Sequence, residues 1–199
     1  MAVPRGVAYL QPARAKKSPT SECVRLSKQV RLSVNGFLTQ ISRSGGGLPK
    51  LAVARPVALT MEGVEGDWQS NRKYHGGPDK AVLMIAAEVL DGLVARGFKV
   101  YPGALGENFT VRGLDPLMWR EGQQYRLGDE AVIELTQLRV PCSTLHAYGL
   151  AVGKQLYDAD CKAGRVSSPV WAFGGFYARV VREGLLAEGM PVRLLSDLA

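Results

Sequence analysis

The loop over residues 71–82, NRKYHGGPDKAV, combines cations, a histidine and paired glycines ahead of an apolar run. Glycines lack a Cβ, so their backbone N–H groups can approach a ligand closely, and such amides beside cations can hold a phosphate. A second glycine run at residues 45–47 precedes another lysine. The glycines of both runs, including Gly76 and Gly77, would form this anion cradle, and the cations nearby are Lys50, Arg72, Lys73 and Lys80. Neither run matches a P-loop or a dinucleotide-binding fingerprint, so tight turns between strands are the alternative.

His75 has three possible roles: a metal ligand, a general base, or a ring that holds the loop through hydrogen bonds. The chain contains only two histidines, so a metal site built from two or three histidines is strongly disfavoured. We favour the third role, in which His75 supports the cradle rather than taking part in chemistry.

Cys142 is the strongest candidate for a reactive group. It follows a proline at the expected end of a strand, and Arg139 lies three residues before it. A neighbouring guanidinium lowers the pKa of a thiol, which makes the sulfur a better soft-metal ligand or nucleophile. A buried, inert cysteine is the alternative. His146 would permit a Cys-His pair, but no third residue completes a protease triad or a zinc tetrad.

The cysteine count disfavours a disulfide framework or a zinc ribbon. Three cysteines form no CxxC pair, and no secretory signal is visible. We therefore expect reduced thiols and a cytoplasmic location.

The net charge of +7 comes almost entirely from one end of the chain. Residues 1–33 contain seven Lys or Arg and one acid, and the remaining residues have a net charge of only +1. We therefore predict a basic, disordered N-terminal extension over residues 1–33 and one domain over residues 34–199. A transit peptide or an anchor to an anionic surface is the alternative for the extension. The balanced charge of the domain argues against a nucleic-acid partner, and no apolar run is long enough for a membrane helix.

The segments that must position these loops are mostly short strands separated by glycine-rich turns. Gly128-Asp129 is typical of a hairpin turn, and one amphipathic helix is expected over residues 87–97, with a second near 150–162. Many short strands and few helices favour a mainly β fold, a closed or partly open β-barrel. The expected strands are residues 34–42, 53–61, 81–86, 107–114, 123–140 (with the hairpin turn inside), 174–181 and 190–195.

Five stretches together resemble the MOSC domain, the module named for the C-terminal part of molybdenum cofactor sulfurase, and in particular its stand-alone bacterial members. They cover nearly all of residues 34–197. In order they are SGGGLPKLAV, GVEGDWQSNRKYHGGPDKAV, PGALGENFTVRGLD, YRLGDEAVIELTQLRVPC and GGFYARVVREGLLAEGMPVRLL.

This resemblance implies a barrel-like fold that binds the molybdenum cofactor, a pterin with a dithiolene and a phosphate, and has no flavin or haem of its own. Cys142 matches the cysteine of the family's PC motif, which is taken as the molybdenum ligand or the carrier of transferable sulfur. Lys50 and Asn108 match a lysine near the first strand and the asparagine of the GEN stretch. The glycine amides with Lys50, Arg72 and Arg139 would meet the phosphate, and Asn108 could address the donor and acceptor edge of the pterin. Trp68 stands at a place that is usually polar or basic; it could stack on a flat ligand, but we expect it to fill the underside of the loop.

The resemblance leaves two activities open. One is a reductase of N-hydroxylated small molecules, such as N-hydroxylaminopurine or amidoximes, which receives electrons from a separate flavin or iron-sulfur protein. The other is a sulfur-carrier or cofactor-delivery module with a persulfide on Cys142. A nucleic-acid-binding module would draw support only from the basic extension.

Overall fold

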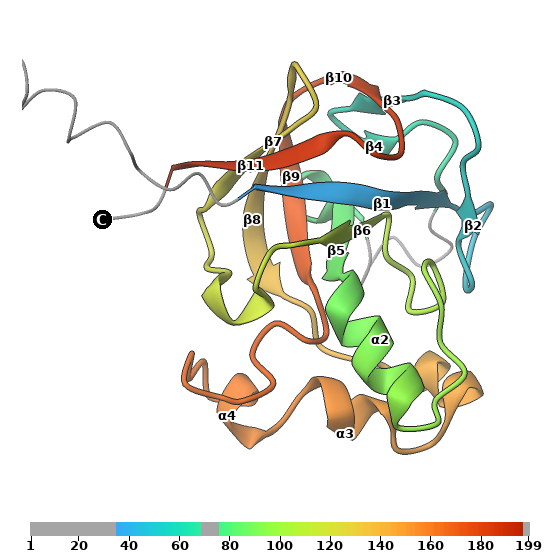
Figure 1. Cartoon of the computed structure of the whole chain (residues 1–199), viewed down its shortest axis with the longest axis vertical. Coiled ribbons are helices and arrows are strands. Elements are labelled where there is room, and N and C mark those ends of the chain that lie inside the picture. Colours follow the sequence, from blue (N-terminus) through green and yellow to red (C-terminus); the bar gives the residue numbers. More distant parts are fainter. Residues whose placement is uncertain (1–34, 69–75, 197–199) are drawn as a thin grey trace, which may run out of the picture. The chain divides into compact units, whose positions relative to one another are not determined.

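Seven strands close into a barrel in the computed structural model, which describes residues 35–68 and 76–196 (Figure 1). The first strand pairs with the last through Asn35 opposite Arg193 and Phe37 opposite Pro191, so the sheet closes on itself. Closure leaves no free edge among these strands. In sheet order they are β11 (Pro191–Ser196), β7 (Gln124–Leu127), β8 (Ala131–Leu138), β9 (Phe176–Arg182), β5 (Val82–Ala86), β6 (Phe109–Arg112) and β1 (Asn35–Arg43). The expected mainly β barrel is confirmed.

Two smaller strand groups extend the barrel. Strand β2 (Leu51–Ala52) pairs with the end of β1, and β10 (Gly184–Leu186), β3 (Val57–Thr60) and β4 (Gly63–Val64) form a separate sheet. The strand expected over residues 53–61 is therefore only half right, because β3 begins at Val57. Pro56 precedes it and has no N–H for a ladder, which fits a strand that starts there.

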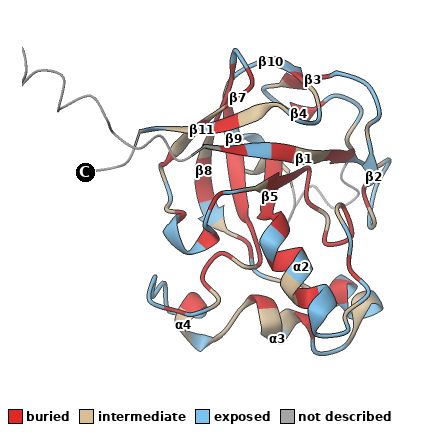
Figure 2. Cartoon of the chain, viewed as in Figure 1, coloured by how far each residue is buried: buried red, intermediate tan, exposed pale blue. Residues whose placement is uncertain are grey.

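Strand β5 is fully buried, as its unbroken apolar run predicted. It runs parallel to β6, and the helix α2 (Ala87–Ala95) makes the crossover between them. The helix buries Val89, Leu90 and Leu93, and Gly97 follows it with φ 87°, the conformation expected after a helix end. Figure 2 shows the buried residues running along β5, β8 and β9 and onto α2.

The β7–β8 hairpin turns at Gly128, which has φ 62°, as predicted. Beyond β8 the chain forms the 3-10 helix η3 (Ser143–Tyr148) and the short helices α3 (Val152–Leu156) and α4 (Ala159–Lys162). The single helix expected near 150–162 is thus two helices. Tyr157 is extended, and the Asp158 side chain accepts the N–H of Cys161 at 2.7 Å to start α4.

Short 3-10 helices also occur at η1 (Pro78–Lys80) and η2 (Pro116–Met118). Within the residues that the structure describes, no helix has the length and apolar character needed to cross a membrane.

Candidate functional site

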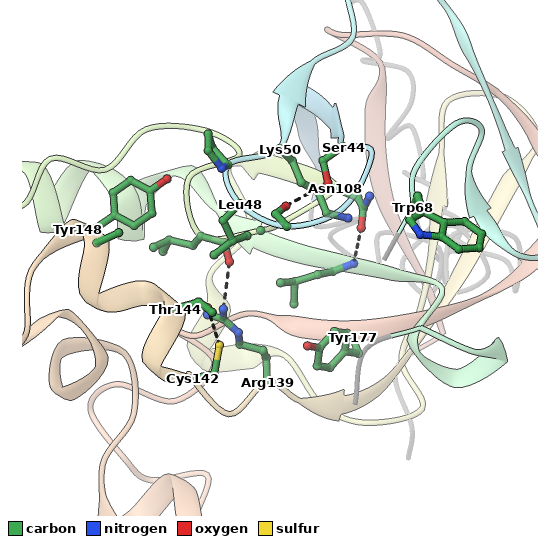
Figure 3. A pocket seen from close by; sticks show the side chains of 16 residues that line it. Ser44, Leu48, Lys50, Trp68, Asn108, Arg139, Cys142, Thr144, Tyr148 and Tyr177 are labelled. Atoms are coloured by element: carbon green, nitrogen blue, oxygen red, sulfur yellow. Dashed lines mark hydrogen bonds between the residues drawn. The ribbon is translucent and has the colours of Figure 1, made fainter. Parts of the chain in front are cut away.

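One cavity of about 640 Å³ opens between the loop that follows β1, the loop before β6 and the segment between β8 and η3 (Figure 3). Its size is ordinary for a site that holds a small organic ligand. Figure 3 shows Ser44, Leu48, Lys50 and Asn108 along one wall and Cys142, Arg139 and Tyr177 along the opposite one. Tyr148 lies at one end and Trp68 at the other. Four of the eight predicted site residues therefore line a single cavity: Lys50, Asn108, Arg139 and Cys142.

Cys142 presents a partly exposed sulfur to this cavity. It lies four residues past the end of β8 rather than at the strand end itself, directly before η3. Its Sγ lies 2.7 Å from the Thr144 hydroxyl. His146 is exposed, and it is Thr144 that partners the sulfur, so the structure does not form the Cys-His pair that the spacing allowed.

The surroundings of Cys142 favour its thiolate. Partial burial by itself raises the pKa of the Cys142 thiol, but hydrogen bonds from the Thr144 hydroxyl and backbone N–H and the charge of Arg139 outweigh it. The net effect is a pKa below the ordinary value. Cys161 differs, because it is buried against Ser168 and burial raises the pKa of its thiol. Of these two cysteines, Cys142 is thus the one suited to bind a soft metal or attack sulfur.

Arg139 is buried behind the sulfur, with 3% of its surface exposed. Its backbone N–H donates to Gly175 O at 2.9 Å, and its Nη2 donates to Leu105 O at 3.0 Å. Its Nη1 makes no hydrogen bond within residues 35–68 and 76–196. Burial raises the pKa of the Tyr177 hydroxyl, and the nearby charge of Arg139 opposes that rise. Arg139 thus places a positive charge in the lining of the cavity, which favours an anionic group there.

Lys50 is not a free cation, as the cradle interpretation supposed. Its ammonium forms a buried ion pair with Asp67, and the two side chains are 7% and 4% exposed. Burial lowers the pKa of Lys50, while the Asp67 carboxylate opposes that shift. The charge that Lys50 offers to a ligand is therefore largely neutralised by Asp67.

Asp67 is the centre of one cavity wall. Besides Lys50, its carboxylate accepts the backbone N–H of Ser44 at 2.8 Å and the Asn108 amide at 2.9 Å. Asn108 also donates to Ser42 O at 3.1 Å and accepts the N–H of Leu83 at 3.1 Å. The Asn108 amide is thus committed to protein atoms, and its role in this arrangement is to hold the wall together.

Glu107 lies beneath this wall and is fully buried. Its Oε1 accepts the Gly103 N–H at 2.7 Å and the Thr110 hydroxyl at 3.2 Å, and its Oε2 has no partner among the described residues. Burial raises the pKa of Glu107. Neither Asp67 nor Glu107 stood out in the sequence, although each is next to a residue that did: Asp67 precedes Trp68, and Glu107 precedes Asn108.

Of the other four predicted site residues, the structure describes only the two glycines. Arg72 and His75 lie outside the described residues, so their assignments stay predictions. Gly76 and Gly77 have positive φ values of 94° and 86°, which suits glycine, but neither is among the described residues that line the cavity. Lys80, in the same segment, places its ammonium 5.5 Å from the centre of the Tyr177 ring.

The expectation that Trp68 fills the underside of its loop is wrong. A ring that fills the underside of its loop would be buried, whereas the Trp68 indole is 55% exposed and lines the cavity. The described residues contain no group of three or more His, Cys, Asp or Glu side chains placed to hold a metal ion. Among the described residues that line the cavity, Cys142 is the soft ligand available to a metal.

The family model for the MOSC domain matches residues 71–193. The YflK protein of Bacillus subtilis (strain 168) is 35% identical in an alignment 154 positions long, which covers 75% of this chain and 63% of YflK. The YiiM protein of Escherichia coli (strain K12) is 31% identical in an alignment 181 positions long, which covers 85% of this chain and 75% of YiiM. The chain thus spans less than two thirds of YflK.

Solved structures show the same fold. The crystal structure of YiiM from Geobacillus stearothermophilus superposes with a TM-score of 0.60 at 28% identity, over 81% of this chain and 75% of that one. YiiM from Escherichia coli gives a TM-score of 0.56 at 25% identity, over 82% and 71% of the two chains.

Proposed function

Because the chain belongs to the MOSC domain family, which is associated with the molybdenum cofactor, we propose that its cavity binds that cofactor with Cys142 as the protein ligand to molybdenum, and that the protein reduces N-hydroxylated small molecules. The observation that carries the proposal is the Cys142 sulfur, which is partly exposed in a cavity beside the buried Arg139 and has a lowered pKa.

The described residues fit the group. A thiolate is a soft ligand of the kind that suits a metal already bound by dithiolene sulfurs. The charge of Arg139, which lines the cavity, favours an anionic group of the cofactor. Lys50 contributes through its ion pair with Asp67, which fixes the opposite wall.

When bound, the cofactor supplies the two-electron chemistry that cleaves an N–O bond. Reduction of an N-hydroxyl group to an amine consumes two electrons and two protons and releases water. The described residues supply binding and exclusion of solvent: the apolar side chains of Leu48, Leu83 and Leu105 line the cavity around the polar groups. The electrons would come from a separate flavin or iron-sulfur protein.

Turnover tests this proposal. Anaerobically purified protein, supplied with an artificial one-electron donor, should convert an amidoxime such as benzamidoxime to its amidine, and Cys142→Ser should abolish the reaction. Cys161→Ser is the matched control, because Cys161 is buried against Ser168 and does not line the cavity. A Cys142→Ser protein with unchanged turnover would refute the proposed role of the sulfur.

A second function, sulfur transfer, is favoured by the partial exposure of the same thiol. A persulfide on Cys142 would pass its outer sulfur to an acceptor thiolate and leave the Cys142 thiolate behind. Sulfur released from the purified protein by cyanide, lost in Cys142→Ser and found in protein that carries no pterin, would support this function over reduction.

A further inference from the structure

Trp68 places an aromatic surface at the end of the cavity away from Tyr148 (Figure 3). The other two tryptophans, Trp119 and Trp171, are 1% and 7% exposed, whereas Trp68 is 55% exposed. An indole ring removes much apolar area from water when it is covered, so an exposed indole in a cavity is a surface on which binding energy is available.

The backbone that carries this ring is held firmly. The Trp68 N–H donates to Ser44 O at 2.7 Å, and the preceding residue, Asp67, accepts hydrogen bonds from Ser44, Lys50 and Asn108. The exposed side chain is therefore attached to one of the most strongly bonded points of the cavity wall. A ligand that covers the ring would not have to order its backbone first, which lowers the cost of binding.

The charge of the cavity selects among the ligands that an indole can bind. An indole face binds flat rings by stacking and cations by electrostatic attraction. The described lining contains two cations, Arg139 and Lys50, and the charge of Lys50 is balanced by its ion pair with Asp67. The remaining positive charge of Arg139 disfavours a cationic ligand. A flat, uncharged or anionic ring is the class that remains.

We propose that Trp68 is a stacking platform for the planar ring of the substrate and that it makes the cavity select aromatic over aliphatic N-hydroxylated compounds. The identity of the substrate rests on the proposed function, but the binding of a flat ring can be measured without turnover. Trp68 lies across the cavity from Cys142 in Figure 3, so it acts on the ring of the substrate and not on the N–O bond.

Two compounds that differ only in the ring isolate this effect. Benzamidoxime carries a flat phenyl ring, and cyclohexanecarboxamidoxime carries the same reacting group on a saturated ring of similar size. Stacking of a ring on an aromatic side chain contributes about 1–3 kcal/mol, which corresponds to a factor of about 5 or more in affinity. We therefore expect Trp68→Leu to raise KM for benzamidoxime at least about fivefold, with little change in kcat and little change for the cyclohexane compound. Trp68→Phe should restore most of the difference.

Fluorescence provides the readout that does not depend on turnover. Trp119 and Trp171 are buried and do not line the cavity. Benzamidoxime should therefore quench the tryptophan fluorescence of Trp68, and this quenching should be absent in Trp68→Leu. Phe37→Leu is the control, because Phe37 is a 43% exposed aromatic residue that does not line the cavity. If benzamidoxime quenches the Trp68 fluorescence of a protein that has no reductase activity, the stacking role of Trp68 is supported and the proposed reductase function is refuted. Equal KM values for both compounds in Trp68→Leu and wild type, with quenching unchanged, would overturn the platform.

Discussion

Asp67 offers the sharpest test of how the cavity wall is built. Its carboxylate receives the Lys50 ammonium, the Ser44 N–H and the Asn108 amide, and its side chain is only 4% exposed. Asp67→Asn keeps the shape of the side chain but removes its charge. The amide N–H₂ that replaces one oxygen would face the donors of Lys50 and Asn108, so at least one of these hydrogen bonds must be lost.

The size of the effect follows from burial. Removing one partner of a buried ion pair leaves the other charge without compensation and typically costs about 3–5 kcal/mol. For a chain of this length each kcal/mol lowers the melting temperature by about 2–4 °C, so Asp67→Asn should melt roughly 6–20 °C below wild type. The matched control is Asp160→Asn, which breaks the exposed pair with Arg165, whose side chains are 43% and 58% exposed. Exposed pairs contribute about 0–1 kcal/mol.

The assay is thermal and urea unfolding of the full chain, followed by far-UV circular dichroism. Introducing Lys50→Met should make the Asp67→Asn change cost less, because the uncompensated charge is then gone. If Asp67→Asn lost no more stability than Asp160→Asn, the ion pair would not support the wall and the reasoning from burial would be wrong.

Three further predictions concern the charges and backbone around the cavity. Arg139→Gln should raise the pH at which Cys142 is alkylated, because the Arg139 charge helps to lower the pKa of that thiol. Peptide-resolved mass spectrometry measures the extent of Cys142 alkylation against pH. The same pH dependence in Arg139→Gln and wild type would show that the Arg139 charge does not act on the thiol. Burial raises the pKa of Glu107 in the folded protein, so its contribution to stability falls as pH rises above about 4.5. Glu107→Gln should therefore flatten the decline of the urea midpoint with pH, and an unchanged slope would refute this. Gly103→Ala would place a Cβ 2.2 Å from a backbone oxygen at φ 90°, so it should lower the free energy of unfolding by more than about 2 kcal/mol. Gly77→Ala, whose Cβ would meet nothing within 4 Å, should lower it by about 1 kcal/mol. Equal losses of stability in denaturant unfolding would contradict the crowding at Gly103.

The barrel could be predicted because its signals are local. The apolar run of β5, the glycine turn of the β7–β8 hairpin and the amphipathic face of α2 each depend on residues a few positions apart. The strands β4 and β10 have two and three residues, too short for a period to be visible, and they were missed. The helix near 150–162 was predicted as one element because a capping aspartate inside an otherwise helical stretch is a weak signal.

The candidate site was predictable only in part, for the same reason. Arg139 and Cys142 are three residues apart, so their approach could be inferred from spacing. Asp67 contacts Lys50, Ser44 and Asn108, which lie 17, 23 and 41 positions away in the sequence. No local sequence pattern predicts contacts over such separations. The sequence predicted Lys50 and Asn108 as ligand-binding groups, and both line the cavity, but it did not predict that both contact Asp67. The exposure of Trp68 likewise depends on packing that a sequence pattern does not reveal.

The most direct test of the account is the molybdenum and pterin content of anaerobically purified protein, wild type beside Cys142→Ser and Cys161→Ser. We expect near-stoichiometric molybdenum and pterin in wild type and Cys161→Ser, and loss of the metal in Cys142→Ser. Cys142→Ser protein that holds as much molybdenum as wild type, or wild-type protein that takes up neither metal nor pterin when the cofactor is supplied, would contradict the proposed role of this cavity.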